Sequence, residues 1–200
     1  MIYPAAYDIT ILQNSTWKAA LRATEQRRTI DSIVISGGKP LFNSECHKLV
    51  NGDKVVFTGT APSGGTLQAP CGVELNTVYF VINSGLTNDA FYVAASSGGT
   101  AISADSTGSG TFYAAKPVNL SGYTIDADLR SLEADQQVAT FSGALVTAAD
   151  GLFQLSLAPA TTSGIDTGRY GYDVSLTNSG GERYYWLQGI ATVARTYSRN

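Results

Sequence analysis

Charged residues are scarce in this chain of 200 residues: Asp, Glu, Lys and Arg make up 14% of it, against roughly 25% in an average soluble domain. With 13 basic and 16 acidic residues, the formal net charge is −3, which argues against a nucleic-acid binder with a broad basic face. No apolar run approaches the roughly 20 residues that a transmembrane helix needs. The N-terminal residues also lack the basic and apolar regions of a secretion signal. We therefore expect neither nucleic acid nor a membrane among the partners.

Side chains for metal binding and nucleophilic catalysis are equally scarce. His47 is the only histidine, so a catalytic triad or a histidine-based metal site would have to use it. Its neighbour Cys46 would point to the opposite face of a strand, so the two are poorly placed to share a zinc ion, even with Cys71 as a further ligand. We interpret His47 as a structural residue that hydrogen-bonds the turn at Gly52 and Asp53. We interpret both cysteines as buried or free thiols, and a disulfide between them is the less favoured alternative.

Carboxylates that could support glycoside hydrolysis are present, but nothing else in the sequence supports that chemistry. Asp126 and Asp128 lie two residues apart, which places them on one face of a strand. Such pairs on a solvent-facing edge usually keep the edge soluble. The segment Gly37–Lys39 lacks the spacing of a phosphate-binding loop. We expect no enzymatic activity, no catalytic or metal-ligating residues and no cofactor.

What the sequence has in abundance is glycine, 21 residues in all, together with a period of two between polar and apolar side chains. Alternation of this kind is typical of half-buried strands with one solvent-facing side. Turn sequences such as Asp150-Gly151 separate the alternating segments. We predict an all-β fold, an antiparallel β-sandwich, with less than about a tenth of the residues in helices. The clearest predicted strands are 8–11, 124–130, 152–157, 170–176 and 185–193. Residues 16–26 have a spacing that also suits a helix, and we favour a strand there.

Composition divides the chain into a host and an insert. From about residue 43 to 115 the sequence becomes very rich in Gly, Ser and Thr, and Lys116-Pro117 ends this stretch. Insertions are tolerated in surface hairpin loops, where extra length costs little entropy. We predict a discontinuous sandwich formed by residues 1–42 and 117–200, interrupted by a small β module at 43–116.

The predicted host contains an ordered series of motifs. A short first strand at 7–11 precedes a strand that begins with Trp17, and a Pro-to-Gly turn at 117–123 later leads into an Asp-rich strand at 126–130. This order resembles a domain common in tailed bacteriophages, including the N-terminal domain of the baseplate upper protein. The resemblance implies that the turn seats the following strand and that the Tyr-Asp strand pairs late in the sandwich. The motifs are 7–11, 117–123, 126–130, Phe141, 150–157, 168–174 and 189–193.

The predicted insert carries a more specific set of motifs, running from His47-Lys48-Leu49 to Gly108–Thr111. It resembles a small β module that recurs in phage structural proteins. Lys48 departs from the family pattern, which has glycine there. The resemblance implies no catalytic role for either part. The intervening motifs are 52–53, 55–57, 78–82, 91–94 and 98–102.

Residues able to anchor a protein interface gather near the C-terminus. Tyr and Trp favour half-buried strand surfaces and also anchor interfaces, so we favour a structural or subunit-interface role over sugar binding. Two stretches without charge, 138–149 and 184–193, are candidates to be covered by another copy or another virion protein, by edge pairing or by face packing. Arg27-Arg28 is a short basic spot that could meet an acidic neighbour. The candidate interface residues are Phe141, Tyr184, Tyr185, Trp186, Arg27 and Arg28, with Tyr185 on the face opposite Tyr184 and Trp186.

Together these features suggest a non-enzymatic structural protein of a phage virion. The resemblance implies a multi-copy adaptor of the tail, baseplate or neck that docks neighbouring virion proteins such as tail fibres. We expect a homo-oligomer whose partners are other virion proteins, assembled in the host cytoplasm. A capsid decoration protein is one alternative, and a carbohydrate-binding module for host adsorption is another. The short segment after the last predicted strand favours an adaptor over a complete fibre.

Overall fold

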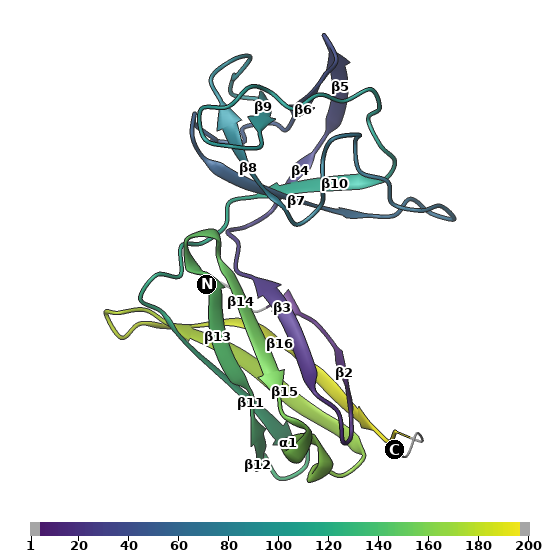
Figure 1. The fold of residues 1–200 in the computed structure, drawn as a ribbon, viewed down its shortest axis with the longest axis vertical. Coiled ribbons are helices and arrows are strands. Elements are labelled where there is room, and N and C mark those ends of the chain that lie inside the picture. Colours follow the sequence, from purple (N-terminus) through teal and green to yellow (C-terminus); the bar gives the residue numbers. More distant parts are fainter. Residues whose placement is uncertain (1–4, 197–200) are drawn as a thin grey trace. The chain divides into compact units, whose positions relative to one another are not determined.

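The computed structural model describes residues 5–196. Most of its secondary-structure elements are strands (Figure 1). Of the described residues, 51% are in strands and 4% are helical, so the predicted all-β, sandwich-like fold is confirmed. The chain forms two compact units. We call residues up to Ala23 and from Asn119 onwards the outer unit, and Thr24–Val118 the inserted unit. Among the described residues, no helix is long and apolar enough to cross a membrane.

The outer unit contains two sheets. The larger has the order β1-β16-β15-β11-β12, with β2 also pairing β16, and the smaller has the order β13-β14-β3. β1 and β2 run parallel to β16, and the other pairs are antiparallel. The elements are β1 (Ala5–Ala6), β2 (Ile9–Leu12), β3 (Trp17–Arg22), β11 (Thr124–Ser131), β12 (Gln137–Thr140), β13 (Ser142–Thr147), η1 (Ala148–Asp150), β14 (Leu152–Leu157), α1 (Pro159–Ser163), β15 (Gly168–Thr177) and β16 (Arg183–Ala194).

The core of the outer unit lies between these sheets. Alternate residues of β14 are buried, as the period-two pattern predicts, and β15 buries Tyr172, Val174 and Leu176 on one side, with Ser175 also buried. Phe141 connects the layers: its ring lies 5.3 Å from the ring of Trp17 in the smaller sheet and 6.0 Å from that of Tyr172 in the larger. The two sheets therefore face each other as a sandwich, with the predicted strand at Trp17 confirmed.

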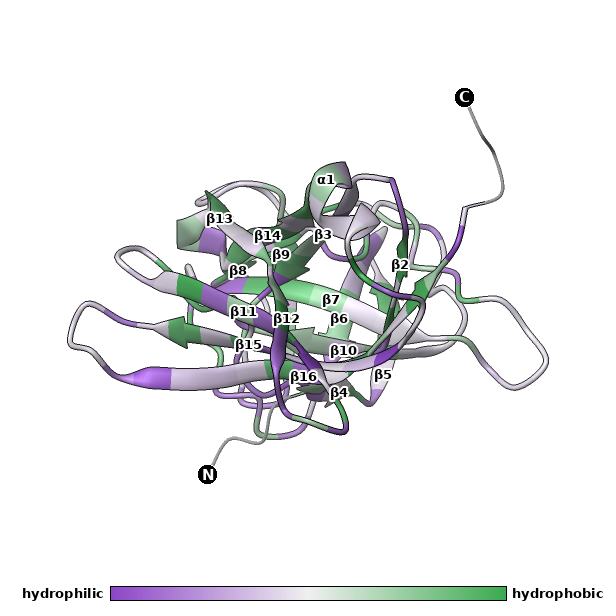
Figure 2. Ribbon diagram, turned by 90° about the horizontal axis from the view of Figure 1, so that it is seen from below, coloured by the Kyte–Doolittle hydropathy of each residue, from purple (hydrophilic) through white to green (hydrophobic). Residues whose placement is uncertain are grey.

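The inserted unit is a single curled sheet with the order β4-β10-β7-β8-β9-β6-β5. Its first and last strands, β4 and β5, are separated only by Asp31 in the chain, so the two ends of the sheet meet at one residue. Stacked Phe42, Phe57 and Phe91 form the centre of its core, and Figure 2 shows the hydrophobic part of β7 in green. The strands are β4 (Arg28–Ile30), β5 (Ser32–Ser36), β6 (Lys39–Asn43), β7 (Lys54–Thr60), β8 (Val78–Ile82), β9 (Ala90–Ala94) and β10 (Thr111–Ala115).

The boundary of the inserted unit differs from the one predicted. Composition placed its start at residue 43, but the unit begins at Thr24 and ends at Val118. The reason is strand pairing: β4 pairs with β10, and Phe42 of β6 lies opposite Phe91 of β9. The segment 24–42 therefore belongs to the core of the inserted unit although its composition resembles that of the outer unit.

Candidate functional site

The predicted aromatic interface residues lie at the start of β16, in its hairpin with β15. Tyr185 pairs with Ser175, whereas Leu187 pairs with Val174, so Trp186 is an additional residue that forms a β-bulge. Tyr185 is 49% exposed and Tyr184 is 37% exposed, so both phenol rings are available to a partner. Trp186 is partly buried, and its indole Nε1 is buried without a hydrogen-bond partner among the described residues.

Tyr184 is held by a local network at the tip of this hairpin. Its hydroxyl donates to Glu182 Oε2 at 2.9 Å, and Asn178 Nδ2 donates to the same oxygen at 2.7 Å. Hydrogen bonds from Asn178 and Tyr184 lower the pKa of Glu182, and the bond to Glu182 raises the pKa of Tyr184. These hydrogen bonds link the residues at the tip of the hairpin, and the Tyr184 ring stays exposed at the surface.

Phe141 cannot act as an interface residue, which corrects the prediction. Only 3% of it is exposed, and its backbone N–H donates to Ala127 O at 2.9 Å. It is the single residue between β12 and β13, where the chain passes from the larger sheet to the smaller. The absence of nearby charge indicated an apolar environment, but that environment is the core of the outer unit itself.

The two charge-free stretches have different positions. Tyr184–Val193 was predicted to be covered by another protein, through edge pairing or through its face. Edge pairing is excluded from Leu187 onwards, because β16 pairs there with β1 or β2 on one side and with β15 on the other. Packing of another protein on the face of β16 stays a prediction. The other stretch, 138–149, contains β13, which is the end strand of the β13-β14-β3 sheet.

β13 is exposed along its whole length. All six of its residues are solvent-exposed, and none carries a charge. Two of them are large aliphatic side chains, Leu145 at 37% and Val146 at 56% exposure. An end strand has backbone N–H and C=O groups on one side that no neighbouring strand pairs, and natural proteins usually protect such strands with charges, proline or a covering segment. This strand, from Ser142 to Thr147, is the candidate docking surface.

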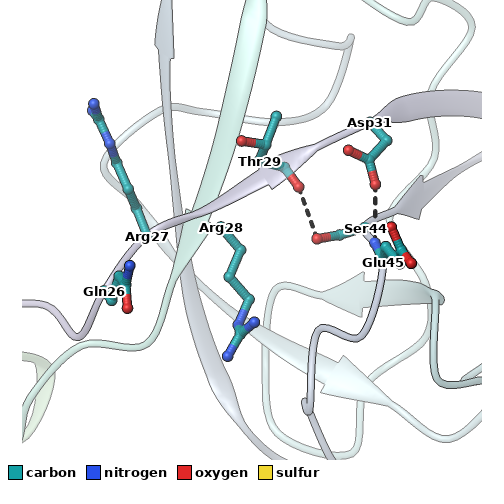
Figure 3. A pocket seen from close by; sticks show the side chains of 7 residues that line it. All are labelled: Gln26, Arg27, Arg28, Thr29, Asp31, Ser44 and Glu45. Carbon is teal, nitrogen blue, oxygen red and sulfur yellow. Dashed lines mark hydrogen bonds between the residues drawn. The ribbon is translucent and has the colours of Figure 1, made fainter.

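Arg27 and Arg28 line a polar cavity of about 280 Å³ in the inserted unit (Figure 3). They do not form a single basic spot, because Figure 3 shows their side chains pointing away from each other. The Arg27 guanidinium lies 4.3 Å from the centre of the Tyr113 ring, and Arg28 Nη1 donates to Cys46 O at 3.3 Å. Two carboxylates, from Asp31 and Glu45, line the same cavity. Its charge is therefore balanced, and it gives no net attraction for an acidic partner.

His47 has a structural position, but it does not bond the predicted turn. It is 2% exposed, and its Nδ1 accepts the backbone N–H of Leu49 at 2.9 Å. Its ring packs edge-on against Phe91, with 5.0 Å between ring centres. The hydrogen bond thus closes the bend at residues 47–49 rather than the turn that follows. The histidine is buried within the core of the inserted unit.

Gly52 and Asp53 do form a turn, as predicted, and Asp53 closes it. Asp53 Oδ2 accepts the backbone N–H of Val50 at 2.8 Å, and the backbone N–H of Asp53 donates to Val50 O at 3.0 Å. Gly52 has a φ of 88°, which residues with a Cβ rarely adopt. Lys116 Nζ also lies 2.6 Å from Asp53 Oδ2. The acid at position 53, not His47, therefore orders this turn.

The remaining sulfur and carboxylate groups form no recognisable metal centre. Cys46 and Cys71 are both free thiols, as one of the two interpretations of the sequence predicted, and both are exposed rather than buried. Within residues 5–196, no group of three or more His, Cys, Asp or Glu side chains is arranged to hold a metal ion.

Comparisons with known proteins give little further information. No protein-family model and no curated protein matches the chain. Among solved structures, one match is the crystal structure of AggA, the major subunit of aggregative adherence fimbriae type I from Escherichia coli. It is 11% identical, the match covers 96% of this chain and 91% of that chain, and the TM-score is 0.19. Similarity of this extent assigns neither a family nor a function.

Proposed function

We propose that this chain is a non-enzymatic structural protein of a tailed-phage virion, present in several copies and acting as an adaptor that docks neighbouring virion proteins. The observation that carries the proposal is β13, an uncharged end strand whose six residues are all exposed. A strand from another copy or from a neighbouring protein could pair with it and satisfy its free backbone groups. The motif order of both units, which resembles that of phage tail and baseplate domains, supports the same role.

The alternatives have weaker support. The capsid decoration role would use the same exposed strand and differs only in location on the virion. The carbohydrate-binding role relies on the exposed rings of Tyr184 and Tyr185, which lie at neighbouring positions of one strand and hence on opposite faces. Two rings on opposite faces do not make a continuous platform for stacking on a sugar chain. The adaptor role therefore remains the stronger proposal.

A charged substitution on β13 tests the proposal. Val146→Lys places a charge on the exposed strand, and Val50→Lys is the matched control, because Val50 is 60% exposed in the other unit. The wild-type mass would be measured by sedimentation equilibrium, with electron microscopy of assembled particles beside it. We expect a homo-oligomer or particle-bound ring that Val146→Lys weakens by roughly tenfold or more, while Val50→Lys leaves it unchanged. A monomer at all concentrations, with β13 uncovered in the particle, would overturn the proposal; binding of a polysaccharide through Tyr185 would favour the carbohydrate-binding role.

A further inference from the structure

The outer face of the larger sheet in the outer unit is hollowed by two adjoining cavities. One measures about 300 Å³ and the other about 530 Å³, and Arg130, Asp135 and Asp173 line both. We call the combined depression the sheet-face groove. Gly171 lines it without a side chain, two residues before Asp173 on the same strand, β15. The groove therefore places Asp173 at its centre.

Three of the four aspartates in the groove already have partners. Asp126 Oδ2 lies 2.8 Å from Arg183 Nη2, and Asp135 Oδ1 lies 3.4 Å from Arg130 Nη1. Asp128 Oδ1 accepts the Thr140 hydroxyl at 2.9 Å and the Gln137 amide at 3.2 Å, and its Oδ2 lies 4.0 Å from Arg130 Nη2. The side chains of Arg183, Arg130 and Gln137 are therefore already bonded to Asp126, Asp135 and Asp128. The groove is lined by an ordered set of polar side chains.

Asp173 is the exception. Among the described residues its side chain makes no hydrogen bond or ion pair, although it is partly buried. It lies directly opposite Asp128 on the neighbouring strand, and like charges at such positions destabilise a sheet. Burial, and next to it the charge of Asp128, raise the pKa of Asp173, and the nearby charges of Arg130 and Arg183 offset part of this rise. With four aspartates against two arginines, the groove keeps an excess of two negative charges.

We propose that the sheet-face groove binds one basic side chain, a guanidinium or an ammonium group, of a partner protein, with Asp173 and Asp128 as its counter-ions. A cation between the two carboxylates would remove their repulsion and give Asp173 the partner that it lacks. The inference rests on the proposed adaptor function, because it names the chemistry of the partner. It concerns a surface separate from β13.

Two other occupants fit the groove less well. A divalent metal is disfavoured because no set of ligating side chains among residues 5–196 is suitably arranged. A neutral saccharide would require aromatic rings to stack on, and Tyr185 is the one aromatic ring lining the 300 Å³ cavity, with Tyr172 buried beneath the larger one. The carboxylates of Asp173 and Asp128, which lie opposite each other, favour a positively charged occupant instead.

A titration on the full chain tests the proposal directly. The probe is N-acetyl-argininamide, with N-acetyl-citrullinamide as the uncharged control of the same shape, and binding is followed through ¹⁵N chemical shifts. We expect saturable shifts at the amides of Asp128, Gly171 and Asp173 with the arginine probe alone. Asp173→Asn should weaken binding roughly tenfold or more. Asp105→Asn, an exposed change in the inserted unit, should leave it unchanged.

The outcomes separate this proposal from the adaptor function. Equal binding of the citrulline probe, or unchanged binding by a folded Asp173→Asn variant, would overturn the groove proposal. Shifts at the same amides with a maltooligosaccharide but not with arginine would overturn it in favour of a sugar site. None of these results affects self-association through β13, which the Val146→Lys variant measures independently. Conversely, a monomeric chain that still binds arginine in the groove would overturn the role of β13 alone.

Discussion

At the scale of single residues, Lys48 is the most informative departure from a general rule. It is exposed and has a φ of 55°, in the left-handed region where a Cβ crowds the following carbonyl. We predict that Lys48→Gly stabilises the inserted unit by about 0.5–1 kcal/mol, since the gain from removing the Cβ exceeds the extra entropy of glycine in the unfolded chain. Urea unfolding would measure the change.

Lys48→Ala is the matched control for that prediction. Alanine removes the charge and the long side chain but keeps the Cβ, so its stability should stay within about 0.5 kcal/mol of the wild type. If both variants were equally stabilised, the effect would come from the side chain and not from the backbone conformation.

Tyr172 gives a prediction about alkaline pH. Burial, followed by the influence of Tyr7 and Asp8, raises its pKa to about 12, and its hydroxyl donates to Tyr7 O at 2.5 Å. The folded chain keeps this proton to a higher pH than the unfolded chain, whose tyrosines ionise near pH ~10. The resulting stabilisation is fully present below pH ~10 and is lost as the pH rises towards 12. Tyr172→Phe should show a smaller fall in unfolding free energy between pH 8 and pH 11; an identical fall would contradict the prediction.

At the scale of elements, alanine substitutions at Phe141 and Leu145 should distinguish an effect on folding from an effect on docking. Phe141 fills the core where the chain changes sheets, so Phe141→Ala should destabilise the outer unit by about 3 kcal/mol or more. Leu145→Ala, on the exposed β13, should change stability by less than about 1 kcal/mol but weaken self-association. Thermal unfolding and sedimentation of both variants would check the contrast. A Phe141→Ala variant as stable as the wild type would mean that the ring is not part of the core.

The elements also show what sequence patterns can predict. Alternation reports that a strand has one buried side, and this was enough for the all-β fold and for the strand at Trp17. It does not report which strand lies alongside, so it could not reveal that β1 and β2, far away in sequence, cover β16. Nor could it find the bulge at Trp186, which depends on register with β15.

The candidate site was predictable to a similar degree. Lack of charge pointed to β13 as a pairing strand, because natural end strands are normally protected by charge. The same lack of charge pointed to Phe141, where the cause is burial within the chain. The sheet-face groove could not be predicted from the sequence, because its central feature is the position of Asp128 opposite Asp173 on the neighbouring strand. Local sequence carries no signal for that pairing.

At the scale of the whole molecule, the two units should fold independently if each is cut at the right residues. The connection to the inserted unit is narrow: Thr24 pairs with Pro117, and the backbone N–H of Glu25 donates to Lys116 O at 2.8 Å. A short Gly/Ser linker can therefore replace Thr24–Val118 without stretching the chain. We predict that the product keeps a folded sandwich, with well-dispersed NMR amide signals and a cooperative thermal transition.

The cut that composition suggests gives the opposite expectation. Replacing residues 45–115 with the same linker leaves β4, β5 and β6 in place but removes β7, β8, β9 and β10, which pair with them or complete their sheet. Phe42 then loses Phe57 and Phe91, and its ring becomes exposed together with unpaired backbone groups. This second product should aggregate or bind a hydrophobic dye, whereas the first should not. If both products stayed folded and soluble, the strands before residue 43 would not be part of the inserted unit. If both failed to fold, the outer unit would need the insert to fold.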